Sequence, residues 1–292
     1  MIHVCEVGPR DGLQNEKKHL TPEQRADLIN RLIDAGVKKI EAVSFVNPKV
    51  VPQMSEPEEV LRRVRRRDGV VLAGLVLSPG GLERALQTDL DVFHLTMATS
   101  DTFNQRNARR TAEQSAAEIE NMIRTVRAAG KDCVAVLGTS FGCPFEGEVA
   151  PERVLGFAER FVEAGCRAVT LADTTGMAHP RQVQQMVARF REALGDDVSL
   201  GLHFHNTRGL GLANVFAGYE AGVRIFDASV GGTGGCPFAP KAVGNVCTED
   251  MIHMFHAMGE ETGIQLEALI DTALWLEQQL ERRLDGMMMK IV

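Results

Sequence analysis

The chain has 292 residues, of which 44% are hydrophobic and 24% are charged, so it can bury a large core in one or two domains. Its formal net charge of −7 argues against a nucleic acid as the main partner, because binding phosphates requires a basic surface. No apolar run approaches the roughly 20 residues that a membrane helix requires. We therefore expect neither a nucleic-acid partner nor a membrane partner.

The N-terminal residues and the cysteines bear on the compartment. The sequence opens with MIHVCEVG, which enters a strand-like run at once and leaves no room for a signal or transit peptide. The 6 cysteines show no C-x-x-C pair and no spacing typical of a disulfide framework. We therefore expect reduced thiols and a cytoplasmic location.

Strand-like runs alternate with helical patterns along the chain. In chain order, strands are expected at residues 2–7, 37–44, 70–76, 90–97, 132–138, 167–172, 198–204 and 225–230. Several of the helices between them begin with a proline, which suits the first helical turn. Strands and helices alternating at one unit per roughly 30 residues predict an α/β fold of the (β/α)8 TIM-barrel type. A doubly wound sheet is the alternative.

The joints between helices and strands repeat. An Ala-Gly pair ends the helical run before a strand at residues 35–36, 129–130, 164–165 and 221–222. Each glycine suits a left-handed helix cap that turns the chain into the next strand. We expect residues 1–292 to form a single barrel domain, in which residues 265–292 are an appended amphipathic helix and tail, frayed at Met287–Met289.

Four polar residues from opposite ends of the chain suggest a metal site: Asp11, His203, His205 and Asn245. The two histidines are two residues apart in a strand-like run, so their side chains leave the same face. Two imidazoles and two oxygen donors suit a divalent cation such as Mn, Mg, Co or Zn. For an H-x-H pair alone, ordinary strand histidines would be an equally good interpretation.

Barrel closure favours the metal-ligand interpretation. Asp11 follows the first expected strand, the histidines end the seventh, and Asn245 follows the eighth. Because the eighth strand of a closed barrel pairs with the first, these ends are neighbours at the carboxyl rim, where barrel enzymes place their active sites. A cation there could polarise substrate hydroxyl and carbonyl oxygens, which makes an enzyme the leading hypothesis.

Other polar residues fall on the same rim: Arg10, Gln14, Glu41, Ser44 and Asp173. A buried arginine could donate a fixed fork of hydrogen bonds to a carbonyl that becomes an enolate. Glu41 and Asp173 could equally form an internal salt-bridge network with Arg10. The two roles are compatible, since such carboxylates could orient the arginine.

A glycine-rich loop follows the eighth expected strand, in the run Gly231–Pro237 (GGTGGCP). A phosphate cradle is one interpretation, but no Walker lysine follows. The interpretation we favour is a mobile flap that carries the thiol of Cys236 to the barrel mouth, because such flaps commonly exclude water from reactive intermediates. Cys143 lies in a similar Gly-Cys-Pro-Phe run, so a simple cysteine-proline turn is the alternative for both segments.

These motifs resemble those of the 3-hydroxy-3-methylglutaryl-CoA lyase family, within the metal-dependent superfamily of lyases and Claisen-condensing barrels. The resemblance spans roughly residues 4 to 265 and rests on Glu6–Glu16 (EVGPRDGLQNE), Ser44–Val46, Pro52–Met54, Gly142–Gly147 (GCPFEG), Asp173-Thr174, His203-x-His205, Gly234–Pro237 and Gly244-Asn245. The first of these motifs and GGCP are specific to the lyase branch, whereas H-x-H is shared across the superfamily.

The resemblance implies roles for several residues. Asp11, His203, His205 and Asn245 would be ligands of Mg or Mn, Arg10 would stabilise an enolate, His203 would also move protons, and Cys236 would lie on the catalytic flap. Gln14, Glu41, Ser44 and Asp173 would bind or orient the substrate. The implied partner is an acyl-CoA substrate, and a homodimer is possible by family resemblance alone.

The implied reaction is retro-Claisen cleavage of a 3-hydroxyacyl-CoA, with 3-hydroxy-3-methylglutaryl-CoA ranked first and acetoacetate and acetyl-CoA as products. Two departures from the family pattern bear on the substrate: Val134-Ala135-Val136 stands where Arg-Gly-Tyr is usual, and Lys241 stands where glycine is common. Citramalyl-CoA or a longer branched substrate therefore stays open. A condensing enzyme of the isopropylmalate or homocitrate synthase type and a non-catalytic barrel are the further alternatives.

Overall fold

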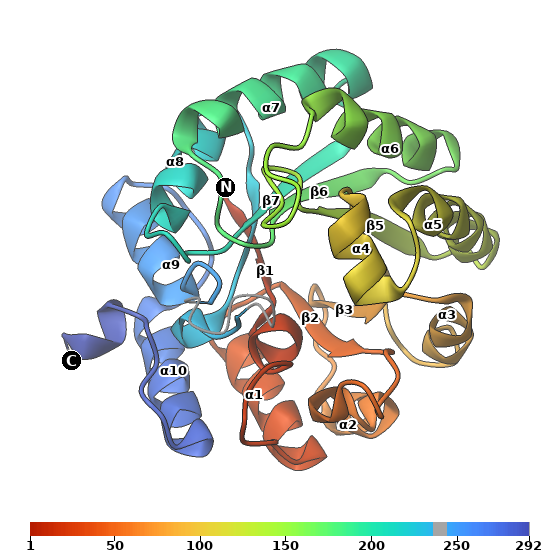
Figure 1. Ribbon diagram of the computed structural model, residues 1–292. Coiled ribbons are helices and arrows are strands. Elements are labelled where there is room, and N and C mark those ends of the chain that lie inside the picture. The colour runs from red at the N-terminus through yellow and green to blue at the C-terminus, as the bar shows by residue number, and fades with distance from the viewer. Residues whose placement is uncertain (236–243, 292) are drawn as a thin grey trace.

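The computed structural model describes residues 1–235 and 244–291, and its strands form one closed barrel (Figure 1). Each strand pairs in parallel with the next, and β8 pairs with β1. The strands are β1 (His3–Glu6), β2 (Lys39–Ser44), β3 (Val71–Val76), β4 (Val92–Ala98), β5 (Asp132–Gly138), β6 (Ala168–Asp173), β7 (Ser199–Phe204) and β8 (Ile225–Ala228). The expected TIM barrel is confirmed, and closure between β8 and β1 excludes the open, doubly wound sheet.

Helices surround the barrel (Figure 1). They are α1 (Pro22–Asp34), α2 (Pro57–Arg63), α3 (Pro79–Ala85), α4 (Asp101–Ala108), α5 (Ala112–Ala128), α6 (Pro151–Glu163), α7 (Pro180–Leu194), α8 (Gly211–Glu220), α9 (Thr248–Ala257) and α10 (Leu266–Leu280). Local sequence sets their starts: α1 begins at Pro22, directly after Thr21, which forms a capping box with Gln24.

The repeated Ala-Gly joints act as predicted. Gly36, between α1 and β2, has φ +98°, and Gly165, between α6 and β6, has φ +109°. A side chain is disfavoured in this left-handed region. At Gly36 there is also no space for one, because an added Cβ would lie 2.5 Å from the carbonyl oxygen of Gly263.

The appended helix α10 packs beside α1 and α9 (Figure 1). The expectation of a frayed end at Met287–Met289 is wrong. The backbone N–H groups of Met287 and Met288 donate to the carboxylate of Asp250, at 2.9 and 2.8 Å, and a short 3-10 turn follows. This anchor holds Met289 in the core with 5% exposure. Within the described ranges, no helix is long and apolar enough to cross a membrane.

Candidate metal centre and active site

Asp11 is placed by a short helical turn, Gly8–Gly12, that follows β1 directly. Gly12, in this turn, packs against the loop after β8: an added Cβ would lie 2.3 Å from the hydroxyl of Thr233. Asp11 is buried within this junction, at 7% exposure. The first ligand candidate therefore lies beside the end of the last strand, as barrel closure predicts.

His203 and His205 come from the carboxyl end of β7, and both are buried. Their ring centroids lie 5.2 Å apart, and the Nε2 of His205 lies 3.8 Å from Asp11 Oδ2. One potential ligand atom from each of Asp11, His203 and His205 falls within 4.8 Å of the others. The histidines thus share one face of the strand end, and that face adjoins Asp11.

Asn245 reaches this cluster because the loop after β8 returns to the end of β7. Asn245 forms an antiparallel bridge with His205, flanked by hydrogen bonds from Val246 N to Phe204 O (3.0 Å) and from Asn206 N to Gly244 O (2.9 Å). The Asn245 amide Nδ2 donates to Asp11 Oδ2 at 2.7 Å. The structure therefore brings all four predicted residues together.

The donor set fits a divalent cation. The Oδ1 of Asn245 and the Nδ1 of His205 are buried without a hydrogen-bond partner in the described parts of the chain. A buried acceptor without a partner is costly, and a cation is one group that would satisfy it. Two imidazole nitrogens, a carboxylate and an amide oxygen form a mixed set that hard or borderline divalent ions accept.

The electrostatics of the cluster keep Asp11 and His205 deprotonated. Burial alone would raise the pKa of Asp11, but Arg10 and the two histidines lower it to about 2. Burial and the neighbouring His203 lower the pKa of His205 to about 4. At neutral pH, Asp11 is therefore an anion and His205 is neutral, which are the protonation states that bind metals.

His203 differs from His205 because it has a carboxylate partner. Its Nδ1 lies 3.2 Å from Asp227 Oδ2, on the adjacent strand β8. Burial would lower the pKa of His203, but the hydrogen bond and charge of Asp227, together with Asp11, raise it above its usual value. The pKa values of the two histidines are thus shifted in opposite directions, and only the shift of His203 favours the protonated form.

Arg10 is fixed beside the cluster by two carboxylates. Its Nε donates to Glu41 Oε2, and its Nη1 donates to Asp11 Oδ1 at 2.7 Å. Gln14 Nε2 donates to the same Asp11 oxygen at 2.8 Å. The expected ion pair between Arg10 and Glu41 is therefore present, and Gln14 contacts the candidate ligand as well.

Asp173 and Ser44 take other places in the site. Asp173 accepts hydrogen bonds from the N–H groups of Met177 (2.7 Å) and Ala178 (3.0 Å), so it holds the loop after β6. Asp173 forms no ion pair with Arg10, whose carboxylate partners among the described residues are Asp11 and Glu41. Burial raises the pKa of Asp173 to about 6. Ser44, at the end of β2, is buried, and its Oγ has no hydrogen-bond partner within residues 1–235 and 244–291.

Two buried polar residues of the barrel interior were missed in the sequence. Asp227 supports His203, and His94, on β4, contacts Glu41 through its Nδ1 at 2.7 Å. The signal was present in both cases as a single titratable residue inside a largely apolar strand: Asp227 in IFDA and His94 in VFHLTMA. Such residues inside a barrel need a hydrogen-bond partner, which here is His203 for Asp227 and Glu41 for His94.

The flap prediction falls on Cys236, which lies outside the described residues. The loop leading to it begins with Gly231 and Gly232, at φ +67° and +64°. Cys143, in the similar run, is fully buried, and its backbone exchanges two 2.8 Å hydrogen bonds with Gly147. For Cys143, the simple turn is therefore the correct interpretation.

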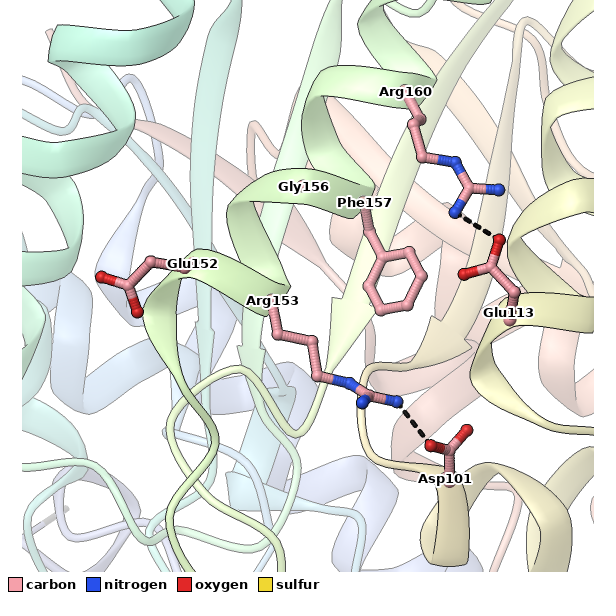
Figure 2. Close-up of a pocket in the computed structure, with 7 residues that line it drawn as sticks. All are labelled: Asp101, Glu113, Glu152, Arg153, Gly156, Phe157 and Arg160. Carbon is pink, nitrogen blue, oxygen red and sulfur yellow. Dashed lines mark hydrogen bonds and ion pairs between the residues drawn. The ribbon is translucent and has the colours of Figure 1, made fainter.

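A surface cavity of about 380 Å³ lies elsewhere, between α4, α5 and α6 (Figure 2). Its two arginines already have carboxylate partners: Arg153 contacts Asp101, and Arg160 contacts Glu113, both at 2.7 Å. Its lining includes none of the metal-ligand candidates. We assign no substrate to it.

The chain is a (β/α)8 barrel, and the cluster of Asp11, His203, His205 and Asn245 at the carboxyl ends of its strands suits a divalent cation. The chain belongs to the HMGL-like family, whose model matches residues 1–275. It is 42% identical to (R)-citramalyl-CoA lyase of Chloroflexus aurantiacus, over 99% of this chain and 94% of that protein. It is 40% identical to hydroxymethylglutaryl-CoA lyase of Pseudomonas mevalonii, over 96% and 92% of the two chains.

A solved structure of an HMG-CoA lyase from Acinetobacter baumannii, in complex with coenzyme A and 3-methylmalate, is similar throughout. It superimposes with a TM-score of 0.95 at 41% identity, over 99% of this chain and 94% of that one. The resemblance found in the sequence is confirmed, and so is the expectation of a carbon–carbon lyase, because the relatives named here are such lyases.

Proposed function

We propose that this protein uses a divalent cation to cleave a 3-hydroxyacyl-CoA by retro-Claisen chemistry, releasing acetyl-CoA and an oxo acid. The observation that carries the proposal is the grouping of Asp11, His203 and His205 within 4.8 Å at the barrel mouth, with Arg10 bonded to the first of them. The similarity to two lyases of acyl-CoA substrates supports it.

Asp11, His203, His205 and Asn245 would hold the cation, which we propose to be Mg or Mn. When bound, such an ion acts as a Lewis acid that makes the substrate hydroxyl more acidic. The proposed ligands are in states that can bind the cation: Asp11 is anionic, His205 is neutral, and Asn245 has an oxygen without a partner among the described residues.

We propose that Arg10 stabilises the enolate of acetyl-CoA that C–C scission leaves. Two carboxylates fix its guanidinium before substrate arrives, so little reorganisation is needed as negative charge develops. Its planar fork can donate two parallel hydrogen bonds, which a lysine cannot do. A proton must then return to the acetyl carbon, and Cys236 is the donor that we propose.

His203 is the proposed carrier of the hydroxyl proton. Because Asp227 occupies its Nδ1, Nε2 is the nitrogen left for the substrate side of the ring. Binding the cation and accepting the proton would both use the lone pair of Nε2, which cannot do both at once. The kcat of His203→Ala at saturating metal separates the two roles. Glu41 orients Arg10 in this proposal, while Gln14, Ser44 and Asp173 line or hold the surrounding loops.

Two substrates are candidates: 3-hydroxy-3-methylglutaryl-CoA, which yields acetoacetate, and citramalyl-CoA, which yields pyruvate. They differ by one methylene between the carbinol carbon and the carboxylate. Val134 and Val136 favour the second, because they place apolar side chains on β5 where the lyase pattern usually has arginine and tyrosine. The carboxylate of the longer substrate lies farther from the carbinol carbon, so it needs a polar partner farther from the cation. The carboxylate of the shorter substrate does not.

A panel of 3-hydroxyacyl-CoAs, assayed with Mg and with Mn for acetyl-CoA release, tests this function. We expect metal-dependent cleavage of at least one panel member and loss of turnover in Arg10→Met. Consumption of acetyl-CoA and a 2-oxo acid without cleavage would instead support a condensing enzyme. Light scattering of the purified protein tests the homodimer that we also propose.

A further inference from the structure

His94 is a buried histidine with one nitrogen bonded and the other without a partner. It lies on β4 at 2% exposure, and its Nδ1 is 2.7 Å from Glu41 Oε1. Its Nε2 has no hydrogen-bond partner in the described segments of the chain. Burying an imidazole with one nitrogen unsatisfied costs free energy, so we looked for a role for the one hydrogen bond that this side chain makes.

That hydrogen bond completes a chain of contacts. Glu41 is 1% exposed, and its two oxygens have different partners: Oε2 accepts from Arg10 Nε, and Oε1 faces His94. Arg10 in turn donates to Asp11 Oδ1. His94 is thus at one end of a row of contacts, and the candidate metal ligand Asp11 is at the other end.

The aligned residues of the strand between Glu41 and His94 offer Glu41 no side-chain donor that could replace His94. Strand β3 separates β2 from β4, and the residues that align there with Glu41 and His94 are Ala73 and Leu75. Both are buried and apolar. Without His94, the Oε1 of Glu41 would be a buried carboxylate oxygen with no donor among the residues described, so the carboxylate would turn and release Arg10.

We propose that His94 is a positioning residue of the lyase reaction: its Nδ1–H donates to Glu41 and so fixes the carboxylate that orients Arg10 toward the reacting carbonyl. This inference rests on the proposed function of Arg10. It assigns the working atom of His94 to Nδ1 and leaves Nε2 as an acceptor that does not touch the substrate.

Three variants test which nitrogen matters. The amide nitrogen of asparagine lies near the place of Nδ1, and that of glutamine lies near the place of Nε2. We expect His94→Leu and His94→Gln to lower kcat by about tenfold or more with little change in KM or Mn affinity, and His94→Asn to retain most of the activity. Rescue by glutamine and not by asparagine would overturn the proposal, as would wild-type kcat in His94→Leu.

A double-variant cycle tests whether His94 acts through Arg10. In the Arg10→Met background, His94→Leu should lower kcat by less than about twofold further, because there is no arginine left to orient. A full additional loss would overturn the proposal. Thr272→Val, which removes a buried hydroxyl in α10, is the matched control for a buried polar deletion and should leave kcat unchanged.

A readout without activity keeps this test separate from the proposed function. The shifts in melting temperature caused by His94→Leu and Arg10→Met should be non-additive, since both variants break one row of contacts. If the wild-type protein cleaved no acyl-CoA of the panel, the proposed function would fail while this coupling could still be measured. Additive shifts would show that His94 and Arg10 are independent.

Discussion

Asp227 on β8 holds the Nδ1 of His203 on β7 at 3.2 Å, so one ring nitrogen of this histidine is occupied by a neighbouring strand. His205 has no such carboxylate on its Nδ1, which lacks any partner among the described residues. The two histidines of one motif are therefore not equivalent. The carboxylate fixes the tautomer of His203 and makes its other nitrogen more basic.

Replacing the two histidines separately should give different defects. We expect His205→Ala to weaken Mn affinity, because it removes a neutral nitrogen donor, whereas His203→Ala should abolish most turnover even at saturating Mn. Calorimetric titration of Mn with each variant, followed by kcat at saturating metal, measures both effects. Full activity of the wild-type protein after exhaustive chelation would rule out the metal-dependent mechanism.

Arg10→Met should preserve the fold while lowering turnover by orders of magnitude, because the lost interaction acts mainly on the developing enolate charge. Arg10→Lys should not restore the rate, since an ammonium group cannot reproduce the planar fork. Steady-state kinetics of both variants provide the measurement, with circular dichroism as the check on folding. A lysine variant near the wild-type rate would show that positive charge alone is sufficient.

Cys236→Ser should reduce turnover more than substrate binding, because a hydroxyl is a much weaker acid than a thiol. Alkylation of the native protein should inactivate it, and substrate should protect Cys236 from the reagent. Peptide mapping of the labelled protein identifies the site. Cys143 is the internal control: it is fully buried, so loss of activity that followed label at Cys143 alone would contradict the assignment.

Val134 and Val136 should weaken the selectivity for 3-hydroxy-3-methylglutaryl-CoA relative to lyases with the usual arginine and tyrosine on β5. Removing a hydrogen-bonding partner from a buried site shifts selectivity by about 1–3 kcal/mol. The ratio of kcat/KM for this substrate and citramalyl-CoA measures the effect, and Val136→Tyr is expected to move the ratio toward the former. A strong preference of the wild-type protein for 3-hydroxy-3-methylglutaryl-CoA over every analogue would refute the altered pocket.

Glu249 should make the protein less stable as the pH rises. It is fully buried, it accepts hydrogen bonds from Gly231 N at 2.9 and 3.1 Å, and burial raises its pKa from 4.5 to about 8. A raised pKa in the folded state means that its contribution is complete below pH 4.5 and is lost between there and pH 8. Chemical unfolding of the metal-free protein from pH 5 to 8 should show this fall, and Glu249→Gln should make it smaller. An unchanged slope in the variant would assign the effect to other groups.

The sequence predicts the barrel well because local signals mark the alternation of strands and helices. Four of the strand-like runs follow Ala-Gly caps such as Gly36, and several helices begin with a proline; these signals act over a few residues. The site is predicted where strand ends are known to meet, which brings Asp11 and His205 together across the chain. His94 stands out locally as a titratable residue in an apolar strand, but its role was missed because it depends on Glu41, two strands away, and a local pattern does not identify that partner.

The bridge between His205 and Asn245 has a consequence for the order in which the protein assembles. The proposed ligands come from the first turn of the chain, from its seventh strand and from the segment that follows the eighth, so none of the earlier barrel units contains a complete set. A nascent chain that has not yet paired β8 with β1 offers the cation only part of its coordination. Tight cation binding should therefore appear late in refolding, when β8 pairs with β1. The bound ion would then stabilise the closed barrel against opening between these two strands.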